Sequence, residues 1–388
     1  MKKLLLLSAL MMLSAGNVWA DVVINETNFP DENFRSYLTS GSYGSDGLLT
    51  DEEIAKITGL YVDFKNIKSL KGIEFFTALT YLYCDKNQLT SLDVSKNTAL
   101  TSLRCSSNQL TTLDVSKNTK LTKLECDYNQ LTTLDVSGCT ALTGLGCYKN
   151  QLTSLDVSRN TRLTTLSCWE NQLTSLDVSK NTALTYLICD GNQLSSLDVS
   201  KNTALTRLWC HSNQLTSLDV SKNTALTELW CYDNQLTSLD VSKNTALTML
   251  YCHSNQLTSL DVSKNTQLRT LGCLQNQIKS AAMDALIESL PATDKGEMYV
   301  IYYENEQNMM TTTQVAAAKV KGWIPYYTED GTGWKEYAGV DPSTGINNVE
   351  ASEADDSAPW YTINGVQLQG KPTAAGIYIR GGKKIIVK

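Results

Sequence analysis

Ten of the eleven cysteines recur at an interval of 21 residues, from Cys84 to Cys273. Such thiols could pair as disulfides or fill an apolar interior. Because the interval is constant, the cysteines form one column on stacked strands roughly 4.8 Å apart. Their side chains point in parallel, which does not allow the Cβ–S–S–Cβ dihedral that a disulfide requires. Because Val62 occupies this column in an imperfect entry copy, 57–78, we expect buried unpaired thiols, with paired cysteines as the alternative. Cys139 stands apart, where other copies have asparagine, and is interpreted as a drifted ladder residue.

Acidic residues near the N-terminus are spaced like calcium ligands. The segment 42–53 resembles an EF-hand loop with Gly47 at its centre and Glu53 at the closing position. Asp46 and Glu53 are the weak calcium candidates, since the first and third ligand positions hold no carboxylate. The alternative is a loop followed by a helical capping box, Thr50-Asp51-Glu52-Glu53.

Catalytic motifs are missing from the sequence. It contains no G-x-S-x-G, no H-E-x-x-H and no P-loop, and its two histidines are His211 and His253. These two share a repeat position but lie two copies apart, about 10 Å, which is too far for one zinc ion. We therefore expect no enzyme, no resident metal and no cofactor.

Nine consecutive 21-residue copies position these side chains, from Leu79 to Gln267. Each copy reads L-x-x-L-x-C-x-x-N-Q-L-T-x-L-D-V-S-x-N-T-x, and a fixed period of this length predicts a solenoid. Leucines at positions 1, 4, 11 and 14, with the cysteine at 6 and the valine at 16, form the inward set. Both halves of a copy have strand-like spacing, so we expect a mostly β solenoid with short parallel strands on two sides of each coil and little helix.

Polar columns accompany the apolar ones. The asparagines at positions 9 and 19 are expected inside turns, where their amides bond backbone groups of the neighbouring coil. The aspartates at position 15 and the basic residues at position 18 form adjacent charged columns on the surface. We expect these two columns to be solvated surface charges; the alternative is that the aspartate column binds metal ions.

Segments outside the copies predict the domain organisation. Six parts are expected: a signal peptide at 1–20, a helical N-terminal cap with the EF-hand-like loop at 21–56, the solenoid at 57–279, an α/β C-terminal cap at 280–339, a linker at 340–359 and a β-rich tail at 360–388.

Bulk properties limit location and partners. A basic start, a short apolar run and Ala20 at a cleavage point indicate export, and no later apolar run has the length of a transmembrane helix. The net charge of −7 becomes −9 without Lys2 and Lys3, which argues against nucleic acid as a partner. The protein is expected to be secreted or at the cell surface.

Two resemblances follow from these residues. The copies resemble leucine-rich repeats of the nested 21-residue IRREKO type, which implies a secreted or surface bacterial protein. The tail, with Tyr361-Thr362-Ile363-Asn364-Gly365, Gly376-Ile377-Tyr378-Ile379 and Lys383-Lys384-Ile385-Ile386, is similar to the sorting segment of type IX secretion cargo. That likeness implies contact with outer-membrane secretion machinery and exposure on the outer membrane exterior.

Comparison of the copies shows where the chain varies. Positions 3, 5, 7 and 8 change freely, and positions 3 and 5 face out from one strand, on the concave sheet of a leucine-rich repeat. The densest candidate ligand-binding face consists of Tyr186, Ile188, Arg207, Trp209, His211, Glu228, Trp230, Tyr232, Met249, Tyr251 and His253.

Exposed Trp, Tyr and Arg are typical of binding hot spots. The favoured function is an adhesin-like module that binds an extracellular protein. The alternatives are glycan capture by aromatic rings and a structural spacer whose aromatics only stabilise the sheet.

Overall fold

The computed structural model describes residues 21–41, 43–302, 306–329, 333–341, 346–347, 359–362, 367–372, 376–380 and 383–387. The predicted signal peptide lies outside these residues. The chain forms two compact units. One holds the described residues up to Met309 together with Ala316–Tyr337, and the other holds Met310–Val315 and the described residues from Ala338 onward.

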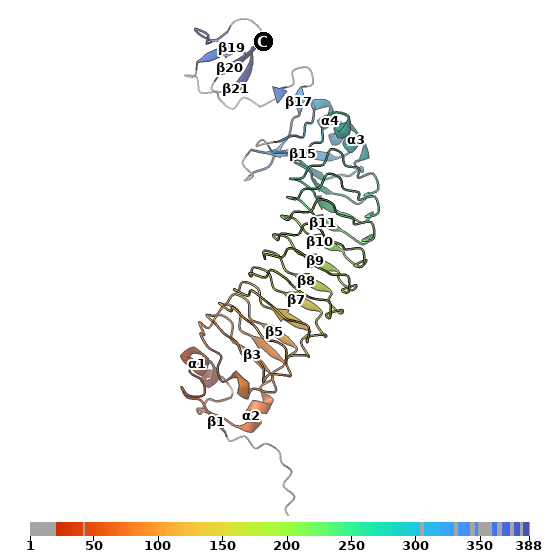
Figure 1. Cartoon of the computed structure of the whole chain (residues 1–388). Helices are drawn as coiled ribbons and strands as arrows, with labels where there is room; N and C mark the ends of the chain where they lie inside the picture. Colours follow the sequence, from red (N-terminus) through yellow and green to blue (C-terminus); the bar gives the residue numbers. More distant parts are fainter. Residues whose placement is uncertain are drawn as a thin grey trace, which may run out of the picture. The chain divides into compact units, whose positions relative to one another are not determined.

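A 14-stranded sheet runs through the first unit, one short strand per coil (Figure 1). Strands β3 to β15 pair in parallel, and β16 closes the sheet antiparallel. This confirms the mostly β, leucine-rich-repeat solenoid expected from the period. The strands are β3 Gly59–Tyr61, β4 Tyr81–Tyr83, β5 Ser102–Arg104, β6 Lys123–Glu125, β7 Gly144–Gly146, β8 Thr165–Ser167, β9 Tyr186–Ile188, β10 Arg207–Trp209, β11 Glu228–Trp230, β12 Met249–Tyr251, β13 Thr270–Gly272, β14 Gly296–Tyr302, β15 Trp323–Thr328 and β16 Lys335–Glu336.

The interior of each coil is filled by the inward set. The leucines, valine and cysteine of every copy are buried, and all eleven cysteines are unpaired. Burial raises the pKa of Cys84 and of the other column thiols, because a thiolate would lose its hydration. The expectation of buried thiols is thus confirmed.

Two asparagine ladders hold neighbouring coils together, as predicted. In the first, Asn108 Nδ2 donates to Cys84 O (3.0 Å) and Cys105 O (3.1 Å), and its Oδ1 accepts from Leu89 N (3.0 Å). In the second, Asn118 Nδ2 donates to two carbonyls of the preceding coil, both at 3.0 Å.

Cys139 takes an asparagine place in the second ladder. Its Sγ donates to Val115 O at 3.5 Å and to Asn118 O at 3.6 Å, the carbonyls equivalent to those that an asparagine there bonds. The interpretation of Cys139 as a drifted ladder residue is confirmed.

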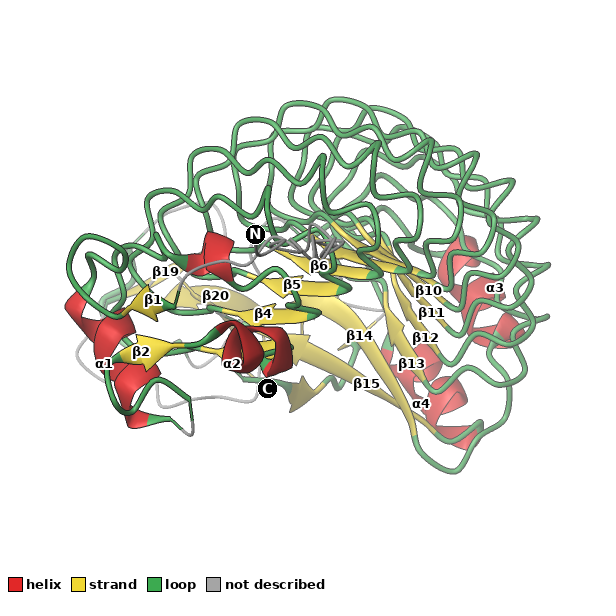
Figure 2. Ribbon diagram, turned by 90° about the horizontal axis from the view of Figure 1, so that it is seen from below, coloured by secondary structure: helices red, strands yellow, loops and turns green. Residues whose placement is uncertain are grey.

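The second strand stack was predicted wrongly. Loops form the outer side of each coil (Figure 2), and the one bridge between equivalent positions there joins Asp93 to Asp114. Asp114 Oδ1 accepts the backbone N–H of Ser116 at 2.8 Å, and the equivalent aspartates repeat this bond. Such local side-chain capture of a backbone donor ends an extended segment, so the acidic column builds turns.

Repeat position 8 varies because it lies in a turn, not on the sheet. Its residues have left-handed backbone conformations in every coil, for example Lys86 (φ 52°), Ser212 (φ 50°) and Asp233 (φ 53°). Gly191 (φ 60°) is the glycine among them. The asparagine that follows then enters the first ladder.

Helices and a small two-stranded sheet close the N-terminal end. Strands β1 (Val22–Val23) and β2 (Leu48–Leu49) pair antiparallel, and helices α1 (Glu32–Ser40) and α2 (Asp51–Lys56) flank them. Phe34 and Leu38 of α1 are buried, and the Thr50–Glu53 capping box at α2 is formed as predicted. A short 3₁₀ helix, η1 (Ile73–Phe75), follows in the first coil.

The C-terminal cap extends the sheet and also the first ladder. Helices α3 (Ala281–Ser289) and α4 (Thr312–Val320) and strands β14 to β16 give this segment the predicted α/β content. Asn308 continues the ladder, since its Oδ1 accepts from Ile278 N at 2.8 Å and its Nδ2 donates to Cys273 O at 2.8 Å. Asn308 lies outside the 21-residue period, so comparison of the copies could not indicate this role.

The second unit contains short antiparallel sheets. Strands β17 (Val340–Asp341) and β18 (Ile346–Asn347) pair within the predicted linker. Strands β19 (Trp360–Thr362), β20 (Gly376–Arg380) and β21 (Lys383–Val387) form the β-rich tail. Asn364-Gly365 and Gly381-Gly382, residue pairs that are typical of tight turns and are expected to form them here, lie outside the described residues. Across the described chain, no helix has the length and hydropathy of a membrane span.

Candidate functional site

The parallel register assembles the predicted binding residues into one surface on β9 to β12 and the turns that follow these strands. Trp209 lies opposite Ile188 on one side and Trp230 on the other, and Trp230 lies opposite Tyr251. The strands line the inner side of the curved first unit (Figure 2). We call this surface the aromatic patch. It consists of Tyr186, Ile188, Arg207, Trp209, His211, Glu228, Trp230, Tyr232, Met249, Tyr251 and His253.

Rings at repeat position 5 stack along the patch. The Trp209 and Trp230 rings are parallel, with centroids 4.1 Å apart and planes 5° apart. Tyr251 meets Trp230 edge-to-face at 5.5 Å. These aromatic side chains were expected to be exposed; the three are half-buried instead, because each ring covers part of its neighbour.

Repeat position 7 forms a second row beside the first. Tyr232 lies between His211 and His253, with ring centroids 4.1 and 4.2 Å apart and nearly parallel planes. Burial lowers the pKa of both histidines to about 4, so both imidazoles are neutral at pH 7. The tyrosine between them also excludes a shared metal ion.

Charged groups at the edge of the patch are paired within it. Arg207 Nε bonds Glu228 Oε1 at 2.9 Å, and the guanidinium lies 5.2 Å from the centre of the Tyr186 ring. Asp190 lies 3.4 Å from His211 Nε2, and burial raises the pKa of this carboxyl to about 6. The patch thus presents fixed polar groups around packed rings.

Three buried polar atoms of the patch have no hydrogen-bond partner. They are Trp209 Nε1, Trp230 Nε1 and His253 Nδ1. Unsatisfied buried groups cost about 1–3 kcal/mol each. In the described residues, the other such atoms are the second-ladder asparagine oxygens and Ser102 Oγ.

The first coils carry a charged network on the same sheet. Arg104 bonds Asp85 at 2.6 Å and Glu125 at 3.1 Å, and Lys123 bonds Glu125 at 2.6 Å. Burial raises the pKa of nearby Asp127 to about 7, although its carboxylate accepts from Ser106 Oγ. The sequence did not single out this group.

The calcium candidates are bonded to their own backbone. Glu53 Oε2 accepts from the N–H and hydroxyl of Thr50, at 2.9 and 3.0 Å. Asp46 Oδ1 accepts from Leu48 N at 3.0 Å, and Ser42 lies outside the described residues. Within the described ranges, His, Cys, Asp and Glu form no group of three that could hold a metal ion. The capping box accounts for the Glu53 carboxylate, and a local bond within the loop accounts for that of Asp46.

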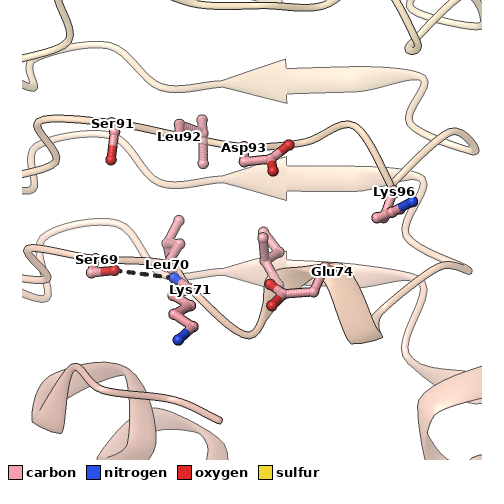
Figure 3. A pocket seen from close by; sticks show the side chains of 9 residues that line it. Ser69, Leu70, Lys71, Glu74, Ser91, Leu92, Asp93 and Lys96 are labelled. Atoms are coloured by element: carbon pink, nitrogen blue, oxygen red, sulfur yellow. Dashed lines mark hydrogen bonds between the residues drawn. The ribbon is translucent and has the colours of Figure 1, made fainter. Parts of the chain in front are cut away.

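A hollow of about 360 Å³ lies between the first two coils, away from the sheet strands (Figure 3). Its polar lining is locally bonded: Ser69 Oγ accepts from Lys71 N at 3.2 Å, and Glu74 accepts from Gly72 N at 2.7 Å. It offers no aromatic ring and no buried reactive group. The lining residues are Ser69, Leu70, Lys71, Ile73, Glu74, Ser91, Leu92, Asp93 and Lys96.

Comparison with known proteins agrees with this geometry. A family model described as leucine-rich repeats in two copies matches residues 203–244. Internalin J of Listeria monocytogenes is 46% identical over 70 residues, which are 18% of this chain and 8% of that protein.

Solved structures extend the likeness to the fold. The functional domain of InlJ from Listeria monocytogenes, described as including a cysteine ladder, shares 39% identity with a TM-score of 0.68, over 76% of this chain and 65% of that one. The Listeria internalin InlF has a TM-score of 0.63 at 23% identity, over 81% and 99% of the two chains, and supports the fold alone.

The chain thus spans less than two thirds of both Listeria InlJ sequences that it matches. The 21-residue period, the buried cysteine column and these matches together show a solenoid similar to leucine-rich-repeat structures, among them the internalins of Listeria.

Proposed function

We propose that the protein is a non-enzymatic recognition module that binds an extracellular protein through the aromatic patch. Leucine-rich-repeat folds of this kind serve typically in protein interactions, and the sequence of residues 1–20 supports a secreted or surface location. An adhesin-like role and a tail that engages outer-membrane secretion machinery belong to the same proposal.

The observation that carries the proposal is the packing of the rings. Because Trp209 and Trp230 cover each other's faces, they offer edges to an incoming partner. Saccharides stack on open ring faces, whereas protein side chains pack well against ring edges and fixed ion pairs. The patch therefore favours a protein over a glycan. Its rings are held in place before binding, which lowers the ordering entropy lost on association.

The test uses the full chain against an array of purified extracellular proteins. The Trp209→Ala, Trp230→Ala, Tyr251→Ala triple variant runs beside the wild type, at a temperature at which both are folded. A matched control, Thr216→Ala with Thr237→Ala, removes exposed side chains from the outer side of the coils. The proposal expects a protein ligand that is lost in the triple variant and kept in the control.

The spacer alternative makes the opposite prediction. If the rings serve stability alone, the triple variant melts at a lower temperature but binds every array protein as the wild type does. Unchanged binding in the triple variant would therefore reject recognition at the patch.

A further inference from the structure

The most exposed aromatic side chains of the inner sheet face lie at its N-terminal end, outside the aromatic patch. Tyr61 on β3 is 54% exposed and Tyr81 on β4 is 43% exposed. Tyr83 lies between them, with its ring centre 5.3 Å from that of Tyr61 and 6.3 Å from that of Tyr81. We call these three residues the tyrosine platform.

The Tyr61 ring lies against the backbone of its own strand. A Cβ at Gly59 would lie 3.0 Å from Cε2, 3.1 Å from the hydroxyl and 3.3 Å from Cζ of Tyr61, so glycine leaves the room that the ring occupies. The Tyr61 backbone N–H donates to the Tyr37 hydroxyl at 3.3 Å, which ties the strand to α1. The ring is thus supported on one side and open on the other.

Ring geometry differs between the platform and the patch. Both platform contacts are edge-to-face, with planes 84° apart, so Tyr61 and Tyr81, which make one ring contact each, keep at least one face outside it. In the patch, by contrast, the Trp209 and Trp230 planes are parallel. Open, supported ring faces are what the C–H face of a pyranose packs on, and exposed apolar surface of this kind marks binding sites.

Polar groups with balanced charge flank the platform. Asp85 pairs with Arg104 at 2.6 Å, and Asp63 accepts from the Asp85 N–H at 2.8 Å. Lys86 places its ammonium 4.7 Å from the centre of the Phe64 ring, and Arg104 lies 5.0 Å from that of Tyr83. Two carboxylates and two cations leave no net charge, so these groups offer donors and acceptors for hydroxyls without attracting an ion.

We propose that the tyrosine platform is a second binding site, for a neutral glycan. One pyranose packs on Tyr61 and the next on Tyr81, while sugar hydroxyls bond Asp63 and Arg104, and the buried Asp85 holds Arg104 in place. The site is independent of the aromatic patch and takes a different class of ligand.

The test titrates the full chain with five uncharged probes: maltohexaose, cellohexaose, xylohexaose, mannohexaose and chitohexaose. Calorimetry is expected to detect saturable binding of at least one. Tyr61→Ala and Tyr81→Ala should each weaken it about tenfold or more, because each removes a ring face. Tyr61→Phe keeps the ring and should bind within about threefold of wild type.

Two controls separate this site from other effects. Tyr128→Ala removes a tyrosine that is 46% exposed on the same unit but is packed against Tyr148 at 5.5 Å and capped by Lys149, and it should bind the sugar normally. The triple variant of the aromatic patch should also bind the sugar normally. Melting curves confirm that each variant is folded.

Three outcomes would overturn the proposal. They are no binding of any probe, binding that survives both Tyr61→Ala and Tyr81→Ala, and tyrosine-dependent binding of an apolar peptide with none of the sugars bound. Each outcome leaves the protein-binding proposal untouched, because that test concerns other residues and another ligand.

Discussion

Repeat position 7, which is buried or half-buried in every coil, shows how the solenoid changes the chemistry of single residues. Carboxyls there have raised pKa values and imidazoles lowered ones, for the same reason: the charged form loses water. Between about pH 4 and 6 the two effects on stability oppose each other. Folded Asp127 and Asp190 hold protons that the unfolded chain releases, and folded His211 and His253 lack protons that the unfolded chain binds.

Asp127→Asn tests how a raised carboxyl pKa changes stability, at the carboxyl of this column with the highest pKa. Its pKa of about 7 means that stability falls as pH rises from about 4 to 7, and the full penalty applies above pH 7. At pH 8 the variant should therefore unfold with a free energy about 1–3 kcal/mol higher, since the amide oxygen still accepts from Tyr148 N. At pH 4 it should match the wild type.

Urea denaturation at both pH values measures the difference. Asp114→Asn serves as the control, because this exposed acid has a lowered pKa from its bond to Ser116 and should lose stability at pH 8. A loss of stability in Asp127→Asn at pH 8 would contradict the assignment.

The thiols give a second residue-level prediction. All eleven are buried, and burial raises the pKa of Cys168 and Cys210 to about 12, so almost no thiolate forms at pH 8. A disulfide reagent should label none of them in the native protein within an hour and all eleven in guanidinium. Rapid labelling of Cys139 alone would show that its ladder position opens to solvent.

Individual elements are predicted from sequence wherever the period fixes them. The inward columns, both asparagine ladders and the Thr50 capping box followed from residue type and spacing. The outer strand stack did not, because two consecutive outward residues and an aspartate-built turn break the alternation that a strand needs. Half-burial of Trp209 was also missed, since it depends on which ring stands opposite in the next coil.

Two further features were missed because they lie outside the regular 21-residue copies. Asn308 ends the first ladder from an irregular cap, and Tyr61 belongs to an imperfect first coil, so neither stood out by comparison of copies.

The left-handed turn at repeat position 8 gives an element-level prediction. Ser212→Gly should raise the free energy of unfolding by up to about 1 kcal/mol, because a non-glycine residue is strained at φ 50°. Gly191→Ala should lower it by about 1 kcal/mol or more, since the added Cβ also lies 3.1 Å from Glu170 Cγ. Chemical denaturation of the pair measures both changes. Equal and negligible effects would show that the turn is not strained.

The whole first unit behaves as a stack of equivalent coils, so its length should be adjustable in units of 21 residues. Deletion of 142–162 joins β6 to β8 in register and should leave a folded protein with its binding intact. Deletion of 226–246 should also fold but lose the protein ligand, because it removes Trp230 and Tyr232.

Deletion of ten residues, 142–151, removes about half a coil, in contrast to the two whole-coil deletions. It shifts every inward column by half a coil and should abolish cooperative unfolding. Circular dichroism and gel filtration distinguish the three deletions. A folded ten-residue deletion would contradict the coil as the unit of the fold.

Affinity at the aromatic patch tests the central claim most directly. Surface plasmon resonance would compare the wild type, the Trp209→Ala, Trp230→Ala, Tyr251→Ala variant and the Thr216→Ala, Thr237→Ala control against the array ligand. The account predicts a loss of about 100-fold or more in the triple variant, roughly 3 kcal/mol, and no change in the control. Dissociation constants within about threefold for all three proteins would contradict it.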